Sequence, residues 1–152
     1  MDGVRGVFFS AKDPVLTTIS EDSMVKLWDT KQLFSAPKGA HIDPYYTLRA
    51  HSGPLLAITG NQIDENISNS QENLVFTAGT EGVIRAWNVM KPETVDNFGP
   101  CGNIDICAGA WKAHEDAIWQ LVHHSREVKP AFGILGSLIS YFSLEPNDII
   151  EL

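Results

Sequence analysis

Two segments of the chain repeat one another, and this repeat limits the folds that the sequence can adopt. The stretch SEDSMVKLWD, residues 20–29, matches GTEGVIRAWN, residues 79–88, with an acidic turn, alternating apolar residues and a tryptophan at the same place. The residues before them also match, since PVLTTI from Pro14 aligns with NLVFTA from Asn73. Apolar and β-branched residues that alternate on both sides of a short polar turn predict a β-hairpin in each copy.

Each predicted hairpin is preceded by a further apolar segment, and a third such segment follows. These segments are VRGVFF from Val4, PLLAIT from Pro54 and AIWQLV from Ala117. A fourth strand is expected at YYTLR near Tyr45 and at DICAGAW near Asp105. Four strands in each repeat are the content of a propeller blade. The sequence therefore predicts an all-β partial β-propeller, with about two four-stranded blades and the start of a third.

The repeat pattern stops near His124, and no tryptophan follows Trp119 where a third copy requires one. We expect residues 1–124 to form the propeller fragment and residues 125–152 a divergent tail. The strand at residues 117–122 then has no hairpin to close it. The tail is either a real structural element or an alternative or non-coding end, which leaves a truncated non-functional product as an alternative. A histidine precedes the second and third repeats but not the first, which suggests a piece of a longer repeat array.

The repeats resemble the WD-repeat family and, within it, the striatin family of scaffold proteins. The motifs DGVRGVFF, PVLTTISEDSMVKLW, DPYYTLRAHSGPLL, GTEGVIRAWN and AHEDAIW carry this resemblance over most of residues 2–119. It implies a scaffold or regulatory subunit that brings protein phosphatase 2A together with kinases and other protein partners. The calmodulin-binding and coiled-coil features of striatins lie outside the matched region, so they are not carried over to this chain.

In the WD-repeat family, a histidine, a strand Ser or Thr, a turn Asp and a strand Trp form a hydrogen-bonded tetrad. The resemblance assigns these places to Thr18, Asp22, Trp28, His51, Thr77, Glu81, Trp87 and His114. Glu81 stands where aspartate is usual, so the reach of its carboxylate to the imidazole stays open. Thr, His and a carboxylate also make up a nucleophilic triad, but the chain has no G-x-S-x-G nucleophile elbow. We therefore expect no enzyme activity.

The resemblance also places several residues at the face of the disc where propellers bind their partners. The expected protein-binding residues are Arg5, Glu21, Leu56, Thr80 and Trp119. Trp119 is the best anchor because tryptophan is enriched at interface hot spots. For Leu56, packing between blades is the favoured alternative. Another WD-repeat adaptor, such as a receptor for phosphorylated or acidic peptides, would need a cluster of Arg and Lys on this face, and only Arg5 fits.

The composition of the chain and the spacing of its cysteines and histidines argue against several other classes of protein. The chain has 19 acidic and 11 basic residues, a net charge of −8, and no basic run, which argues against a nucleic-acid partner. Cys101 and Cys107 do not have zinc-ligand spacing, and the adjacent His123 and His124 would point to opposite faces of a strand, so we expect no metal and no cofactor. Without a signal-peptide pattern or an apolar run of about 20 residues, we expect no membrane span and a cytoplasmic location.

Overall fold

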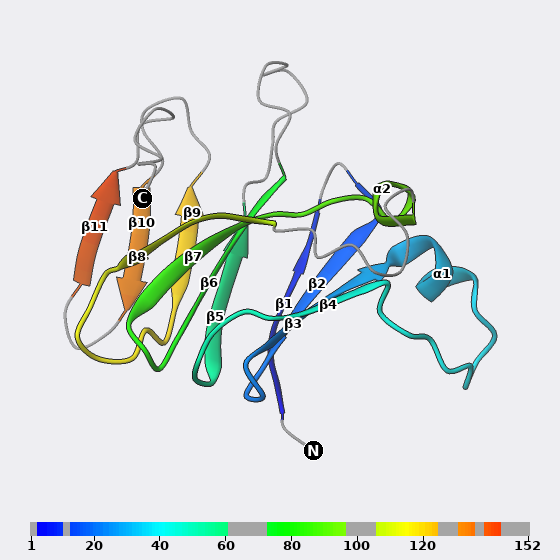
Figure 1. Ribbon diagram of the computed structural model, residues 1–152, viewed down its shortest axis with the longest axis horizontal. Helices are drawn as coiled ribbons and strands as arrows, with labels where there is room; N and C mark the ends of the chain where they lie inside the picture. The colour runs from blue at the N-terminus through cyan, green and yellow to red at the C-terminus, as the bar shows by residue number, and fades with distance from the viewer. Residues whose placement is uncertain are drawn as a thin grey trace.

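A computed structural model describes residues 3–10, 13–60, 73–96, 106–124, 131–135 and 139–143 of the chain. Three antiparallel sheets follow one another along the sequence, each one beside the next (Figure 1). The all-β partial propeller predicted from the sequence is confirmed.

The first sheet, blade 1, has the strand order β1-β2-β3-β4. Its strands are β1 (Val4–Phe9), β2 (Val15–Ser20), β3 (Met24–Asp29) and β4 (Tyr46–Arg49). The hairpin of β2 and β3 is the one that the alternation in SEDSMVKLWD predicts. Thr17 and Thr18 each pair across it, with Leu27 and Lys26 respectively.

The second sheet, blade 2, repeats this topology with the order β5-β6-β7-β8. Its strands are β5 (Leu55–Gly60), β6 (Leu74–Gly79), β7 (Val83–Asn88) and β8 (Cys107–Lys112). The first strand pair of each blade carries a register shift at the same place, between Val4 and Gly6 in blade 1 and between Leu55 and Ala57 in blade 2. The repeat in sequence is therefore also a repeat in backbone geometry.

The third sheet has the order β11-β10-β9, with β9 (Leu121–His124), β10 (Ala131–Leu135) and β11 (Ile139–Ser143). The expectation that no hairpin closes the strand near residue 120 is wrong, because β10 and β11 form a hairpin and β10 pairs with β9. The expected strand from Ala117 also begins later, at Leu121. The division at residue 124 stays a prediction, and the ladder between β9 and β10 runs across it.

Two short helices lie after the third strands of the two blades, and neither was expected from the sequence. They are α1 (Thr30–Ser35), which Asp29 caps by accepting a hydrogen bond from the backbone N–H of Lys31, and α2 (Pro92–Asp96). Lys31 of α1 lies 3.6 Å from Glu93 of α2, so the helices adjoin at the same end of the two blades (Figure 1). Among the helices in the described ranges, none has the length and apolar character that a membrane span requires.

Blade 2 is buried on both of its faces. On one face it packs against blade 1 in a cluster that includes Val15, Ile19, Leu27, Leu55, Val75 and Trp87. On the other face, Phe76, Ala78 and Ile84 pack with Ile118 and Leu121, which lie before and within β9. In blade 1, alternate residues of β2 are buried, whereas Val7 and Phe9 of β1 are 56% and 52% exposed.

A polar network also joins the two blades at the end where the helices lie. Asp13, before β2, is buried and accepts hydrogen bonds from Asn73, before β6, and from Lys91, whose Nζ lies 2.8 Å away. This ion pair raises the pKa of Lys91. Tyr45 of blade 1 donates a hydrogen bond of 2.7 Å to the carbonyl of Met90. Burial raises the pKa of the Tyr45 phenol, so this hydroxyl stays a donor.

The hairpin turns of the two blades share a left-handed residue. Ser23 has φ 69° and Gly82 has φ 66°, and both follow an acidic residue in the turn. The left-handed region costs an ordinary residue about 1 to 2 kcal/mol. A Cβ at Gly82 would also collide with the carbonyl oxygen of His114.

We predict that substitution lowers the stability of the chain at Gly82 but not at Ser23. Gly82→Ala should destabilise the chain by at least about 1 kcal/mol, because it adds left-handed strain and a backbone collision. Ser23→Gly should cost nothing measurable, since it relieves the strain and offsets the entropy that glycine loses on folding. Urea unfolding followed by tryptophan fluorescence checks both. Equal costs at the two positions would contradict the shared turn geometry.

Candidate functional site

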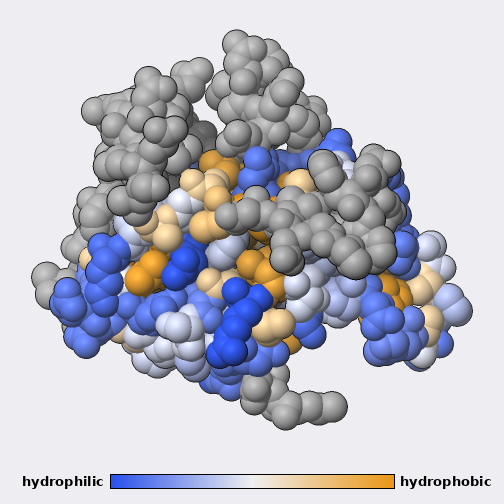
Figure 2. Space-filling view, viewed as in Figure 1, coloured by the Kyte–Doolittle hydropathy of each residue, from blue (hydrophilic) through white to orange (hydrophobic). Residues whose placement is uncertain are grey.

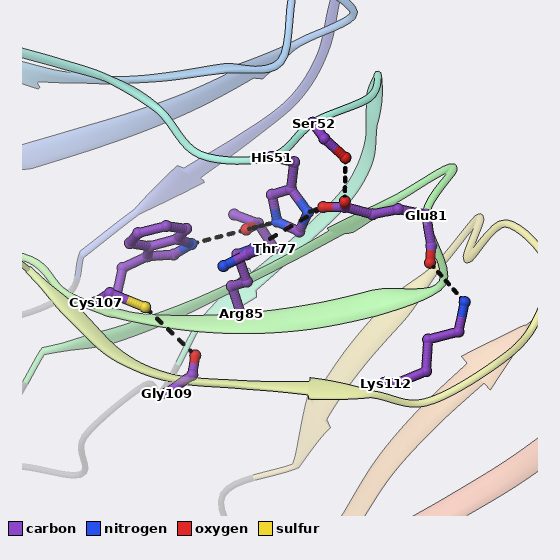
Figure 3. Close-up of polar contacts among 9 residues, drawn as sticks. His51, Ser52, Thr77, Glu81, Arg85, Cys107, Gly109 and Lys112 are labelled. Carbon is purple, nitrogen blue, oxygen red and sulfur yellow. Dashed lines mark hydrogen bonds and ion pairs between the residues drawn. The ribbon is translucent and has the colours of Figure 1, made fainter. Parts of the chain in front are cut away.

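His51 is the centre of a buried polar network between the two blades. It lies in the connection from β4 to β5, and its side chain is completely buried. Its Nδ1 contacts a carboxylate oxygen of Glu81 in the turn between β6 and β7. Its Nε2 lies 2.9 Å from Oγ1 of Thr77 on β6, and the indole Nε1 of Trp87 on β7 donates to that same Oγ1 at 2.7 Å. Figure 3 shows the imidazole between the threonine and the glutamate.

The chemistry of these groups fixes the direction of each hydrogen bond. An ionised carboxylate only accepts, so His51 donates to Glu81 from Nδ1–H. The indole of Trp87 only donates, so Thr77 accepts from it and donates its own hydroxyl proton to His51 Nε2. Every polar atom of the imidazole, hydroxyl and indole is then satisfied. The network fits a neutral His51 with its proton on Nδ1.

Glu81 reaches the imidazole despite standing where aspartate is usual, and it gains further partners. Ser52, next to His51, donates its hydroxyl to the second carboxylate oxygen at 2.5 Å. Arg85 Nε lies 3.9 Å from the first carboxylate oxygen, and Lys112 of β8 donates to the backbone carbonyl of Glu81 at 2.9 Å. The carboxylate of Glu81 therefore contacts both His51 and Ser52, two consecutive residues of the connection between the blades (Figure 3).

The pKa values of the pair follow from this geometry. Burial lowers the pKa of His51, and the nearby Glu81 carboxylate opposes that effect without cancelling it. Burial alone would raise the pKa of Glu81, but the hydrogen bonds from Ser52 and His51 outweigh burial and lower it. At neutral pH the site therefore holds a neutral imidazole against an ionised carboxylate.

Blade 1 contains a corresponding but smaller set. The indole of Trp28 donates to Oγ1 of Thr18 at 3.0 Å, as Trp87 does to Thr77, but this pair is only partly buried. Asp22 is exposed, and one of its carboxylate oxygens accepts from the backbone N–H of Met24 in its own turn. Among the described residues, no histidine joins Thr18 to Asp22.

His114 occupies the place in the second connection that His51 occupies in the first. Its backbone N–H donates to the carbonyl of Gly82 at 3.1 Å, but its buried Nε2 has no hydrogen-bond partner within the described ranges. The structure thus brings together four of the eight expected tetrad residues as a complete set, two as a pair, and leaves Asp22 and His114 apart from such sets.

The expected binding residues lie at the end of the sheets where the hairpin turns are, opposite the helices. Arg5 and Glu21 form an ion pair with each other, which lowers the pKa of Glu21. Thr80 is exposed and its side chain adjoins Gly53, while Leu56 on β5 is half-buried. Trp119 is 65% exposed in the connection before β9.

Sequence reasoning missed Ser52, Arg85 and Lys112, the additional partners of Glu81. The sequence offers one local signal for the contact between Ser52 and Glu81. Ser52 directly follows His51, and the side chain of Glu81 is one methylene longer than the usual aspartate. Within the part of the chain that the structure describes, no three His, Cys, Asp or Glu residues are grouped so that they could hold a metal ion. The chemistry that this arrangement offers is structural, because Thr77 and His51 are closed to solvent.

We predict that Thr77→Val destabilises the chain by about 2 to 5 kcal/mol, because it orphans a buried indole N–H and a buried imidazole nitrogen without changing the side-chain shape. Thr18→Val is the matched control and should cost about 1 kcal/mol or less, since Trp28 is only partly buried. Urea unfolding of both variants measures the difference. A control that costs as much as Thr77→Val would show that the buried network adds nothing.

The pKa shifts predict loss of stability on acidification. The pKa of His51 is lower in the folded chain than the ordinary value of 6.5, so the unfolded chain takes up the proton first as the pH falls. Stability should decline from about pH 6.5 downward. The lowered pKa of Glu81 should add a second decline below about pH 4.5. Urea midpoints measured between pH 8 and pH 4 test this, and constant or rising stability from pH 7 to pH 5 would contradict it.

Comparison with known proteins agrees with this geometry. A family model described as WD domain, G-beta repeat matches residues 1–29. Striatin-3 of Bos taurus is 38% identical over 126 residues, 80% of this chain and 14% of that protein. Striatin of Homo sapiens is 32% identical over 126 residues, and a striatin homolog of Dictyostelium discoideum is 33% identical over 129, each match covering 80% of this chain and 15% of that protein.

The chain therefore spans about one seventh of the length of these relatives. Two blades with the same strand order and the same register shift, each with a threonine–tryptophan pair, are the structural counterpart of the sequence match. The chain therefore carries a WD repeat and is similar to the striatins over 80% of its length.

Proposed function

We propose that the chain is a non-catalytic protein-interaction module of a striatin-like scaffold. The observation that supports this most directly is the burial of the histidine, the threonine and the tryptophan of the tetrad. Thr77 has no exposed surface, and its hydroxyl is already engaged with His51 and Trp87. A nucleophile needs access to its substrate, and this hydroxyl has none. These residues build a rigid frame instead.

The proposed partners are components of protein phosphatase 2A and kinase complexes, and the proposed location is the cytoplasm. The support for both is the similarity to striatins, because a resemblance to that family implies a scaffold for the phosphatase and kinases. Because the chain covers 14% to 15% of those relatives, the proposal concerns the whole protein of which these blades form the matched part. We propose no nucleic-acid partner, in keeping with the net charge of −8.

The proposed contact surface is the end of the sheets where the hairpin turns lie. Trp119 supplies an exposed indole, and Glu115 and Asp116 are exposed in the same connection. The ion pair of Arg5 and Glu21 lies at the same end of blade 1. An aromatic anchor with a charged rim is the usual composition of a protein interface. Elsewhere, on the face in Figure 2, apolar residues lie in small patches separated by hydrophilic ones.

We predict that Trp119→Ala weakens binding of the purified phosphatase 2A core enzyme by at least about tenfold, as expected for an aromatic hot spot. Phe34→Ala is the matched control, since Phe34 is 80% exposed on α1, at the opposite end of the sheets. Its affinity should stay within about threefold of the parent chain. Isothermal titration calorimetry with each variant gives the comparison.

The outcomes separate the two parts of the proposal. Binding that Trp119→Ala leaves unchanged would remove the contact surface but keep the scaffold role. A parent chain that folds and shows no binding to the phosphatase would remove the proposed partner.

A further inference from the structure

Trp119 differs from the other three tryptophans of the chain in its surroundings. The indoles of Trp28 and Trp87 donate to threonine hydroxyls. The ring of Trp111 makes an edge contact with the ring of Phe76. Trp119 is instead 65% exposed, in the connection between β8 and β9. Tryptophan is enriched among the hot spots of protein interfaces, so this exposed ring is an anchor to which a partner can bind.

The connection that carries Trp119 is hydrogen-bonded to the hairpin of β6 and β7 on both sides of its exposed part. Ile118, directly before Trp119, is completely buried, and its backbone N–H donates to the carbonyl of Gly79 at 3.0 Å. At the start of the connection, the backbone N–H of Ala113 donates to the carbonyl of Gly82 at 2.9 Å. An ordered backbone therefore presents the indole, which lowers the entropy that binding costs.

Two acidic side chains precede Trp119 in the same connection, and both are open to solvent. The side chain of Glu115 is 95% exposed, and Asp116 is exposed as well. Lys112 lies beside them, with its Nζ 3.8 Å from a carboxylate oxygen of Glu115. The same Nζ also donates to the backbone carbonyl of Glu81 at 2.9 Å. The surroundings of the exposed indole therefore carry more negative than positive charge.

An indole ring and a carboxylate favour the same chemical group in a partner. The face of an indole attracts an ammonium or guanidinium cation, and a carboxylate pairs with either of them. The Cα atoms of Glu115 and Trp119 lie no more than about 14 Å apart, because only four residues separate them. A single extended segment with two basic residues therefore reaches both side chains. An acidic or phosphorylated segment would be repelled by Glu115 and Asp116.

We infer that the connection between β8 and β9 binds an extended basic segment of a protein partner. One Lys or Arg side chain lies over the indole of Trp119, and a second one pairs with Glu115 or Asp116. Arginine fits best, since its planar guanidinium stacks on an aromatic ring and also forms two parallel hydrogen bonds to a carboxylate. The inference rests on the proposed role of the chain as a protein-interaction module and adds the chemistry of the bound segment.

Titration of two short labelled peptides with the full chain tests this inference. The first peptide alternates arginine with glycine, and the second has glutamate in place of each arginine. Fluorescence anisotropy at low ionic strength should show saturable binding of the arginine peptide and no binding of the glutamate peptide. Added salt should weaken the binding, because the charges are exposed. Trp119→Leu should weaken it about threefold, since leucine has no ring to attract a cation.

Two double variants with the same net charge locate the binding. Glu115→Gln with Asp116→Asn should weaken binding of the arginine peptide about fivefold, as expected for the loss of exposed charge pairs. Asp43→Asn with Glu93→Gln is the matched control, because these exposed acids lie before β4 and in α2, at the opposite end of the sheets. The affinity of this control should stay within about twofold of the parent chain.

The outcomes separate this inference from the proposed function. Equal losses in the two double variants would indicate attraction to the overall negative charge and would overturn the inference. Equal binding of both peptides, or binding of neither, would also overturn it. Phosphatase binding that depends on Trp119, in a chain that does not bind the arginine peptide, would keep the proposed function. Arginine-peptide binding that depends on Trp119 and Glu115 would support the inference even without phosphatase binding.

Discussion

The hydroxyl group of Thr77 is the contact on which the arrangement of the two blades depends. It accepts from Trp87 and donates to His51, so one oxygen joins two strands of blade 2 to a connection that arrives from blade 1. Glu81 holds the other side of the same imidazole and also binds Ser52. Because His51, Thr77 and Trp87 are buried, breaking one hydrogen bond among them leaves its partner without water to replace it. These hydrogen bonds therefore hold the connection that leaves blade 1 against blade 2.

Apolar packing and a second polar network hold the two blades together around this contact. Blade 1 covers one face of blade 2 with the alternate apolar residues of β2, and the Asp13 network closes the opposite end of the same interface. On the other face of blade 2, Ile118 and Leu121 pack against Phe76, Ala78 and Ile84. A pair of blades joined by buried side chains suits the proposed scaffold role, since this frame presents the connection that carries the exposed Trp119.

The strands were predictable because period-two alternation and a polar turn are local signals, and all strands of the two blades lie close to where the sequence placed them. The short helices α1 and α2 were not, since neither segment spans enough turns to show a helical period. The contact of Asp13 with Asn73 and Lys91 joins residues far apart in sequence and has no local signature. The pairing of β10 and β11 was not predictable from the repeat, because residues 125–152 contain neither the threonine nor the tryptophan that mark the hairpins of the two blades.

The protonation state of His51 tests the account most directly, because the account requires a neutral imidazole that donates from Nδ1 and accepts at Nε2. Nitrogen-15 chemical shifts of the imidazole ring at pH 7 distinguish a protonated nitrogen from an unprotonated one. We expect His51 to show a single tautomer with a protonated Nδ1, a bare Nε2 and a proton that exchanges slowly with water. Shifts averaged between the two tautomers, or titration at the ordinary value of 6.5, would show that His51 is not locked between Glu81 and Thr77 and would contradict the account.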